Sequence, residues 1–320
     1  MIMRVRQTLA LLVALCVSAG RAEAQSCTFA MTNVNFGTID VASNVNFDTT
    51  ATLNVTCSGI PTRRVRVCPH FGSGSGGVAA GGDPRYMLSG ATQMRYNIYR
   101  NAARTNVWGS FYWGQPPTPP TVNINLNGAG IGTASVTAFA RVPSGQTTLP
   151  TGIYSSSFSG GHTLVAYAYT TVGNCAAIGT MNATQVPFLV TADNISSCTV
   201  SATTLDFGSK GLLDTNVDAA NQINVTCSSA VPYTVGLNGG SSGATDPSQR
   251  KMTLGAAQVT YGIYRDAART QPWGNTIGSD TVAGIGTGSV QVLTGYGRVP
   301  MQTTPAPGTY TDTVVVTVTY

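Results

Sequence analysis

Alternation of apolar and polar residues runs through the chain and predicts β-strands. The clearest run covers residues 312–320, where Val314, Val316, Val318 and Tyr320 fall on one face. A period of two residues is typical of a strand that packs one face on a core. No stretch carries the sustained 3.6-residue period of an amphipathic helix. The pattern therefore predicts an all-β protein.

A different pattern covers residues 1–24 and predicts a secretory signal peptide. A basic start leads into an apolar run over residues 9–17, and small residues precede a cleavage position after Ala24. No second apolar stretch reaches the roughly 18 residues that a bilayer span needs. We therefore expect a protein that is exported after removal of residues 1–24.

The sequence repeats itself, which indicates one domain fold used twice. The longest match aligns YNIYRNAARTNVWG at residues 96–109 with YGIYRDAARTQPWG at residues 261–274. Both copies also carry NVTC, AGIGT and RVP in the same order. A repeat of this length is too long for a solenoid. We expect two domains, over residues 25–192 and 193–320.

Six cysteines follow the signal peptide, an even number that is typical of an exported, disulfide-bonded protein. A bond present in both copies must join equivalent cysteines, and the two remaining cysteines then pair within the first copy. The predicted bonds are Cys27–Cys57, Cys198–Cys227 and Cys68–Cys175. Each closed loop of about 30 residues should contribute about 3 to 4 kcal/mol. No CxxC or Cys-His spacing supports a metal site instead.

Composition argues against nucleic-acid binding and against catalysis. The formal net charge is +5 and the basic residues form no run, whereas nucleic-acid binding normally needs a basic stripe. The one glutamate, Glu23, lies in the signal peptide, and the two histidines, His70 and His162, lie in no catalytic motif. We expect no enzyme activity, no cofactor, no metal and no nucleic-acid partner.

The shared strings resemble the spore coat protein U domain family, which includes the subunits of archaic chaperone-usher pili. The resemblance rests on the Y-x-x-Y-R-x-A-A-R-T-x-x-W-G string, on F-G after the first cysteine of each copy, and on G-x-Y before a Val/Thr strand. It covers both copies. It implies two tandem immunoglobulin-like, pilin-type β-sandwiches, of which the C-terminal one lacks its last strand.

The resemblance also implies partners. A periplasmic pilus chaperone lends a strand to the open edge, and an outer-membrane usher exchanges that strand for the N-terminal strand of the next pilus subunit. Residues 186–192 (VPFLVTA) are able to close the first copy, whereas no such segment follows the second. Two residues separate the expected cleavage site from Cys27, too few for a donor arm of roughly 10 residues.

These ends lead us to expect a pilus tip adhesin at the cell surface that mediates attachment and biofilm formation. Its second domain would accept the donor strand, or first the chaperone, along Val314, Val316, Val318 and Tyr320. The alternative is a structural spore-coat or extracellular matrix protein, as the family's name suggests.

An insertion in the first copy supplies the main candidate contact loop for a host or abiotic surface. Phe111, Tyr112 and Trp113 stand together there, braced by prolines. The alternative, weighed equally, is that the three rings fold back over the edge of the sandwich.

Two further loops of the first copy are weaker candidates for surface binding. One carries Val78 and Ala79 between glycines, and the other carries Leu149 and Pro150. An ordinary connecting role is the simpler interpretation of both loops.

The arginines of the long shared string are expected to hold local turns through hydrogen bonds. Asp266 in the second copy is replaced by Asn101 in the first. A salt bridge common to both copies is therefore not expected.

Overall fold

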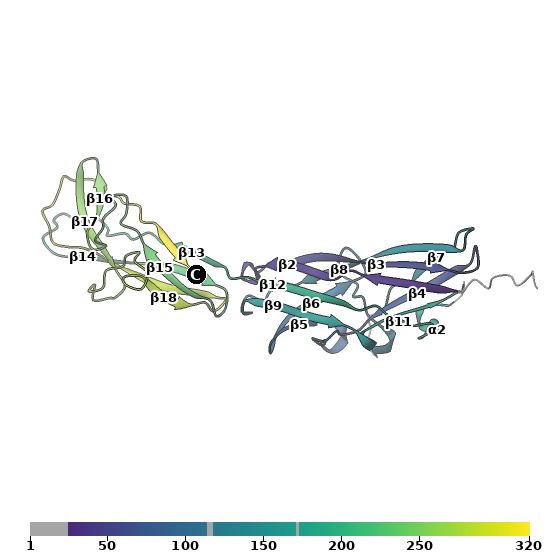
Figure 1. Ribbon diagram of the computed structural model, residues 1–320. Helices are drawn as coiled ribbons and strands as arrows, with labels where there is room; N and C mark the ends of the chain where they lie inside the picture. Colours follow the sequence, from purple (N-terminus) through teal and green to yellow (C-terminus); the bar gives the residue numbers. More distant parts are fainter. Residues whose placement is uncertain (1–24, 114–117, 171–172) are drawn as a thin grey trace, which may run out of the picture.

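The computed structural model describes residues 25–113, 118–170 and 173–320, and the expected signal peptide lies outside this part of the chain. Strands make up nearly all of the regular structure, and they form two groups (Figure 1). Residues 26–194 build one pair of sheets, and residues 198–319 build another. The predicted all-β class is confirmed. We call the two groups the first and the second repeat.

The first repeat contains an eight-stranded sheet with the order β1-β3-β8-β6-β5-β9-β12-β2. Its strands are β1 (Ser26–Met31), β2 (Val34–Ile39), β3 (Phe47–Ser58), β5 (Arg85–Ser89), β6 (Thr92–Tyr99), β8 (Ile131–Val142), β9 (Gly152–Phe158) and β12 (Phe188–Asn194). The alternation in β3 shows why it forms, because Leu53 and Val55 are buried while Asn54 and Thr56 are exposed.

A four-stranded sheet with the order β11-β10-β4-β7 faces the first. Its strands are β4 (Arg64–Phe71), β7 (Val122–Asn125), β10 (Thr163–Ala168) and β11 (Thr184–Gln185). The helical segments are short: η1 (Val41–Ser43), η2 (Ala80–Gly82), η3 (Phe111–Trp113), η4 (Gly160–His162) and α2 (Cys175–Ile178). Within the described residues no helix is long and apolar enough to span a membrane.

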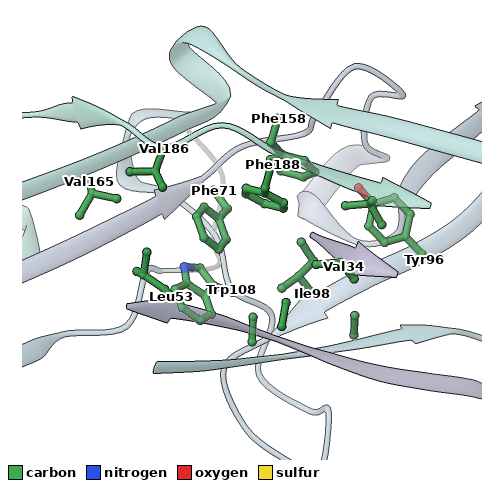
Figure 2. Packing of buried hydrophobic residues seen from close by; sticks show 14 of the residues in the cluster. Val34, Leu53, Phe71, Tyr96, Ile98, Trp108, Phe158, Val165, Val186 and Phe188 are labelled. Atoms are coloured by element: carbon green, nitrogen blue, oxygen red, sulfur yellow. The ribbon is translucent and has the colours of Figure 1, made fainter. Parts of the chain in front are cut away.

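The core of the first repeat is built around a fully buried tryptophan (Figure 2). Trp108 stacks on Phe71 with ring centroids 4.7 Å apart, and its indole Nε1 donates a hydrogen bond to the carbonyl oxygen of Pro69 at 2.8 Å. A buried indole needs such a partner. The tryptophan of the shared string is therefore a structural residue that joins the core to β4.

The second repeat contains a five-stranded sheet with the order β13-β14-β19-β17-β16 and a three-stranded sheet with the order β18-β15-β20. The strands are β13 (Cys198–Ala202), β14 (Val217–Cys227), β15 (Pro232–Leu237), β16 (Arg250–Leu254), β17 (Ala257–Tyr264), β18 (Val282–Ile285), β19 (Val290–Val299) and β20 (Val316–Thr319). Trp273 takes the place of Trp108, and its Nε1 donates to the carbonyl oxygen of Val235 at 2.8 Å.

The three predicted disulfides are confirmed. Cys27–Cys57 and Cys198–Cys227 each join the first strand of a repeat to the strand beside it, with Cα atoms 4.0 and 4.1 Å apart. Cys68–Cys175 ties β4 to α2, with Cα atoms 5.5 Å apart. Bonds of this kind persist in oxidising compartments, which fits the expected export.

Each repeat also buries an arginine at an equivalent position that was not among the predicted residues. Arg250 is fully buried and donates to the carbonyl oxygens of Leu237 and Trp273 at 3.1 and 2.7 Å. Arg85 makes the equivalent bonds to Phe71 and Trp108 at 2.9 and 2.7 Å. Burial lowers the pKa of both guanidinium groups, and the converging carbonyl oxygens compensate for the lost water.

The two repeats are joined by residues 195–197, between the end of β12 and the start of β13. Ile195 N donates to the carbonyl oxygen of Ile39 at 3.0 Å, and Ser197 N donates to Ser228 Oγ at 3.0 Å. The linker is therefore hydrogen-bonded to both the first and the second repeat. The expected domain boundary after residue 192 stays a prediction.

Candidate functional site

The first repeat is closed by a strand from the segment that leads into the second. β12 lies between β9 and β2 in the eight-stranded sheet. It runs antiparallel to β9, with Phe188 opposite Phe158 and Asn194 opposite Gly152, and parallel to β2. The prediction that residues 186–192 contribute a closing strand to the first repeat is thus confirmed.

Side chains on one face of β12 fill the core of the first repeat. Phe188, Val190 and Ala192 are buried, whereas Leu189 between them is 37% exposed. The Phe188 ring lies 4.4 Å from that of Phe158 and 4.9 Å from that of Phe71 (Figure 2). Each buried apolar side chain of this size contributes about 1.5 to 3 kcal/mol. β12 is therefore part of the core and not a loose extension.

The equivalent place in the second repeat is open. Residues 203–211 correspond to β2 but form no strand, and residues 308–314 correspond to β9 but form only a single bridge, Thr253 to Thr311. In the described part of the chain no strand lies between these two segments. We call the space between residues 202–211 and 304–316 the open groove.

Two adjoining hollows of about 580 and 500 Å³ make up the open groove. Both are lined by Leu205, Phe207, Met252 and Tyr310. These residues belong to or border the core of the second repeat. The groove is therefore a slot into the core, not a shallow surface feature.

Most of the residues that line the groove were not predicted as site residues, although two motifs shared by the repeats include some of them. The F-G motif supplies Phe207 and the G-x-Y motif supplies Gly308 and Tyr310, and all three line the groove. In the first repeat the equivalent Tyr154 is buried beside β12. Two of the motifs that carried the family resemblance, F-G and G-x-Y, thus lie on the segments that flank a closing strand.

The predicted groove residues fall into two groups. Val314 and Val316 line the open groove, and Val318 packs against the same core from β20. Tyr320 is 56% exposed and lies outside the lining. Burial alternates from Asp312 to Thr319, but the strand covers only Val316–Thr319, because its partner β15 ends at Leu237, opposite Val316.

Asp312 is one of the charged residues that line the groove, together with Asp206 and Lys210. Its Oδ2 accepts a hydrogen bond from Tyr261 OH at 2.6 Å, and its Oδ1 accepts one from Ser241 N at 2.7 Å. Burial, and then the bond to Asp312, raise the pKa of the Tyr261 phenol. Tyr261 therefore remains a protonated donor that holds the carboxylate in place.

The aromatic loop of the first repeat is partly exposed to solvent and partly packed against the sandwich. Phe111 and Tyr112 are 41% and 39% exposed, yet the Tyr112 ring lies 4.4 Å from that of buried His70. The backbone of Trp113 belongs to η3, but its side chain lies outside the described part of the structure. Part of the loop thus rests on β4 while two rings still face solvent.

The other two candidate loops lie in different surroundings. Val78 is 36% exposed, bridges to Arg85 and is followed by half-buried Ala79. Pro150 pairs with Ser229 of the second repeat, and Leu149 packs against the core of the first. The loop with Leu149 and Pro150 therefore lies at the junction between the repeats.

The fold and the groove define a class of protein: two all-β repeats, one closed by an internal strand and one open. The chain belongs to the Spore Coat Protein U domain family, whose model matches residues 12–159 and 184–317. No curated protein sequence matches it.

One solved structure has a similar fold. A chain of the CsuC–CsuE chaperone-tip adhesion subunit pre-assembly complex, from archaic chaperone-usher Csu pili of Acinetobacter baumannii, aligns with a TM-score of 0.57. It is 15% identical, over 92% of this chain and 100% of that one. The CupB6 tip adhesin from Pseudomonas aeruginosa aligns more weakly, with a TM-score of 0.34 and 11% identity over 92% of this chain and 94% of that one.

Proposed function

We propose that this protein is a pilus tip adhesin whose second repeat is anchored by a β-strand from another polypeptide. The strand enters the open groove, first from a periplasmic chaperone and then, at an outer-membrane usher, from the N-terminal segment of the next subunit. The first repeat faces outward and attaches the cell to a host or abiotic surface, which promotes biofilm formation. The role is one of binding, not of catalysis.

The observation that carries this proposal is the contrast between the two repeats. The first repeat has β12 in the position where the second has the open groove. In the second repeat no strand pairs with the flanking segments along this slot into the core, which is the arrangement that strand addition requires. The Csu complex of similar fold is described as a chaperone bound to a tip adhesion subunit, which supports the same assembly route here.

The adhesive role of the first repeat rests on a separate feature. Its groove is already filled by its own chain, so it needs no strand from a partner. It presents Phe111 and Tyr112 as exposed rings in one loop. Exposed aromatic side chains are typical of contact surfaces.

Self-complementation tests the groove. A copy of residues 184–194, fused after Tyr320 through a flexible linker, should turn an aggregating protein into a monomer on size-exclusion chromatography. The matched control carries Asp at the copied positions of Phe188 and Val190, whose side chains would enter the groove. If the chain without a fused strand is already monomeric and equally stable, the proposal fails.

Localisation tests the place in the pilus. Immunogold labelling of intact cells should mark the ends of surface fibres. Uniform labelling of the cell or spore surface would instead support the structural coat protein.

A further inference from the structure

We propose that the open groove selects a strand that carries serine or threonine at the position facing Asp312. This inference rests on the proposed function, because it concerns the chemistry of the strand that fills the groove. It names Asp312 as a residue that determines which strands fit.

The two repeats can be aligned residue by residue at this point. Tyr154 OH donates to the carbonyl oxygen of Pro150 at 2.8 Å, and Tyr310 OH donates to that of Ala306 at 2.6 Å. Two residues after each tyrosine, the first repeat has Ser156 and the second has Asp312.

The surroundings of Ser156 and Asp312 support the conclusion that these two residues occupy equivalent positions. A Cβ atom added at Gly74 would collide with Ser156 Oγ, and one added at Gly240 would collide with Asp312 Oδ2. Both side chains therefore lie against a glycine turn at the same place. A carboxylate has replaced a hydroxyl at one position of the groove.

In the first repeat an apolar residue covers this position. Val190 of β12 lies opposite Ser156, and both are fully buried. Valine is acceptable there because Ser156 Oγ already accepts a hydrogen bond from Gly76 N at 3.3 Å. A small neutral hydroxyl with a partner costs little to bury.

The Asp312 carboxylate in the second repeat needs more hydrogen-bond donors than the Ser156 hydroxyl does. It accepts bonds from Ser241 N and Thr313 N on Oδ1, at 2.7 and 2.8 Å, and from Tyr261 OH on Oδ2, at 2.6 Å. An ionised carboxylate offers about four acceptor sites. These three bonds leave one site of Oδ2 for another donor.

A strand in the place of β12 would remove Asp312 from water, as β12 does for Ser156. Covering the remaining acceptor site with a valine would leave a buried charge incompletely bonded, which is costly. A hydroxyl on the incoming strand would supply the fourth bond without adding bulk. Threonine has nearly the shape of valine, so it fits the same space.

A neutral donor suits the site better than lysine. Buried Arg250 already places a positive charge where it interacts with Asp312. A second cation would have to be buried beside it. The geometry therefore points to a hydroxyl and not to a charged side chain.

The test uses the full chain with the fused strand described above, in a two-by-two design. The copied position of Val190 is kept as Val or changed to Thr, and the groove carries either Asp312 or the substitution Asp312→Ser. The measurement is the protection of backbone amides 308–314 against hydrogen exchange. Asp312→Asn serves as a milder second variant if Asp312→Ser does not fold.

With Asp312 present, the threonine strand should give on the order of tenfold greater protection than the valine strand, the size of one hydrogen bond to a charged group. In Asp312→Ser the preference should vanish or reverse, and in Asp312→Asn it should shrink. Equal protection by both strands, or the same ratio in every background, overturns this inference and leaves the groove proposal intact. If neither fused strand protects these amides relative to the unfused chain, both proposals fail.

Discussion

Phe188 stacks on Phe158 with ring centroids 4.4 Å apart and an interplanar angle of 12°. The two residues come from strands that lie antiparallel and adjacent, with Phe188 supplied by the segment that leads into the second repeat. This contact joins the closing strand to the core of the first repeat (Figure 2).

Phe188→Ala should therefore destabilise the first repeat by about 3 to 5 kcal/mol, because it leaves a cavity among Phe71, Phe158 and the core. Urea unfolding measures the change. Leu189→Ala is the matched control, since its side chain is on the solvent face of the same strand and should cost well under half as much. Equal losses for the two variants would show that β12 does not contribute to the core.

The sequence predicted more of the fold than of the site, and particular residues show why. The repeat fixed the disulfides, and the apolar run at residues 186–192 was sufficient to predict a closing strand. The lining of the groove was missed because Leu205 and Met252 come from separate segments that only the tertiary fold brings together.

Ion pairs were missed for a similar reason. Asp48 bonds Arg141 on the neighbouring strand and Arg104, and Asp218 bonds Arg298 and Arg269 in the same way. The expectation that the repeats share no salt bridge was therefore wrong, because it considered only the neighbouring Asp266. Which residues face each other across strands depends on register, which a single sequence does not show.

These ion pairs should make stability depend on pH at the acidic end. The hydrogen bond from Arg141 holds the pKa of Asp48 below its usual value of 3.8 in the folded state. The folded state thus binds fewer protons, so the stabilisation is present above pH 3.8 and is lost as pH falls through the lower folded pKa.

Asp48→Asn should flatten the acid limb of the stability curve, as followed by thermal unfolding at pH 2 to 7. Arg141→Gln should flatten it less, because Arg104 still pairs with Asp48, and the double variant should add nothing to the effect of Asp48→Asn. Additive losses would mean that the two side chains act independently.

His70 should give a second pH dependence, at milder acidity. Burial lowers its pKa from 6.5 to about 4 in the folded state. The unfolded chain binds the proton first, so stability falls as pH drops from about 6.5 towards about 4. His70→Gln should remove this decline in the unfolding midpoint, whereas His162→Gln, at a less buried histidine, should retain most of it. An unchanged profile in His70→Gln would contradict the account.

Replacing both Phe111 and Tyr112 by Ala should reduce attachment of piliated cells to an apolar surface such as polystyrene. Both rings are more than a third exposed but Tyr112 packs on His70, so the unfolding free energy should fall by about 2 kcal/mol. The control is Ile277→Ala in the second repeat, where a 62% exposed side chain lies far along the chain from this loop. Attachment that is unaffected by the double substitution would assign the contact surface elsewhere.

The central claim is that the open groove accepts a strand in the direction and register that β12 has in the first repeat. Disulfide trapping tests it most directly. In the first repeat Asp193 lies opposite Ile153, which is 68% exposed, and Leu189 lies opposite Ser157. The equivalents of Ile153 and Ser157 in the second repeat are Thr309 and Thr313. Paired residues of this kind are close enough for a disulfide.

The measurement uses the full chain with either Thr309→Cys or Thr313→Cys, and a synthetic peptide of residues 184–196 with Asp193→Cys. The account predicts rapid cross-linking to the protein with Thr309→Cys and little to the one with Thr313→Cys. A peptide with Leu189→Cys should show the opposite preference. Cross-linking without regard to position, or none at either cysteine, would contradict the claim that the second repeat is completed by a strand in this groove.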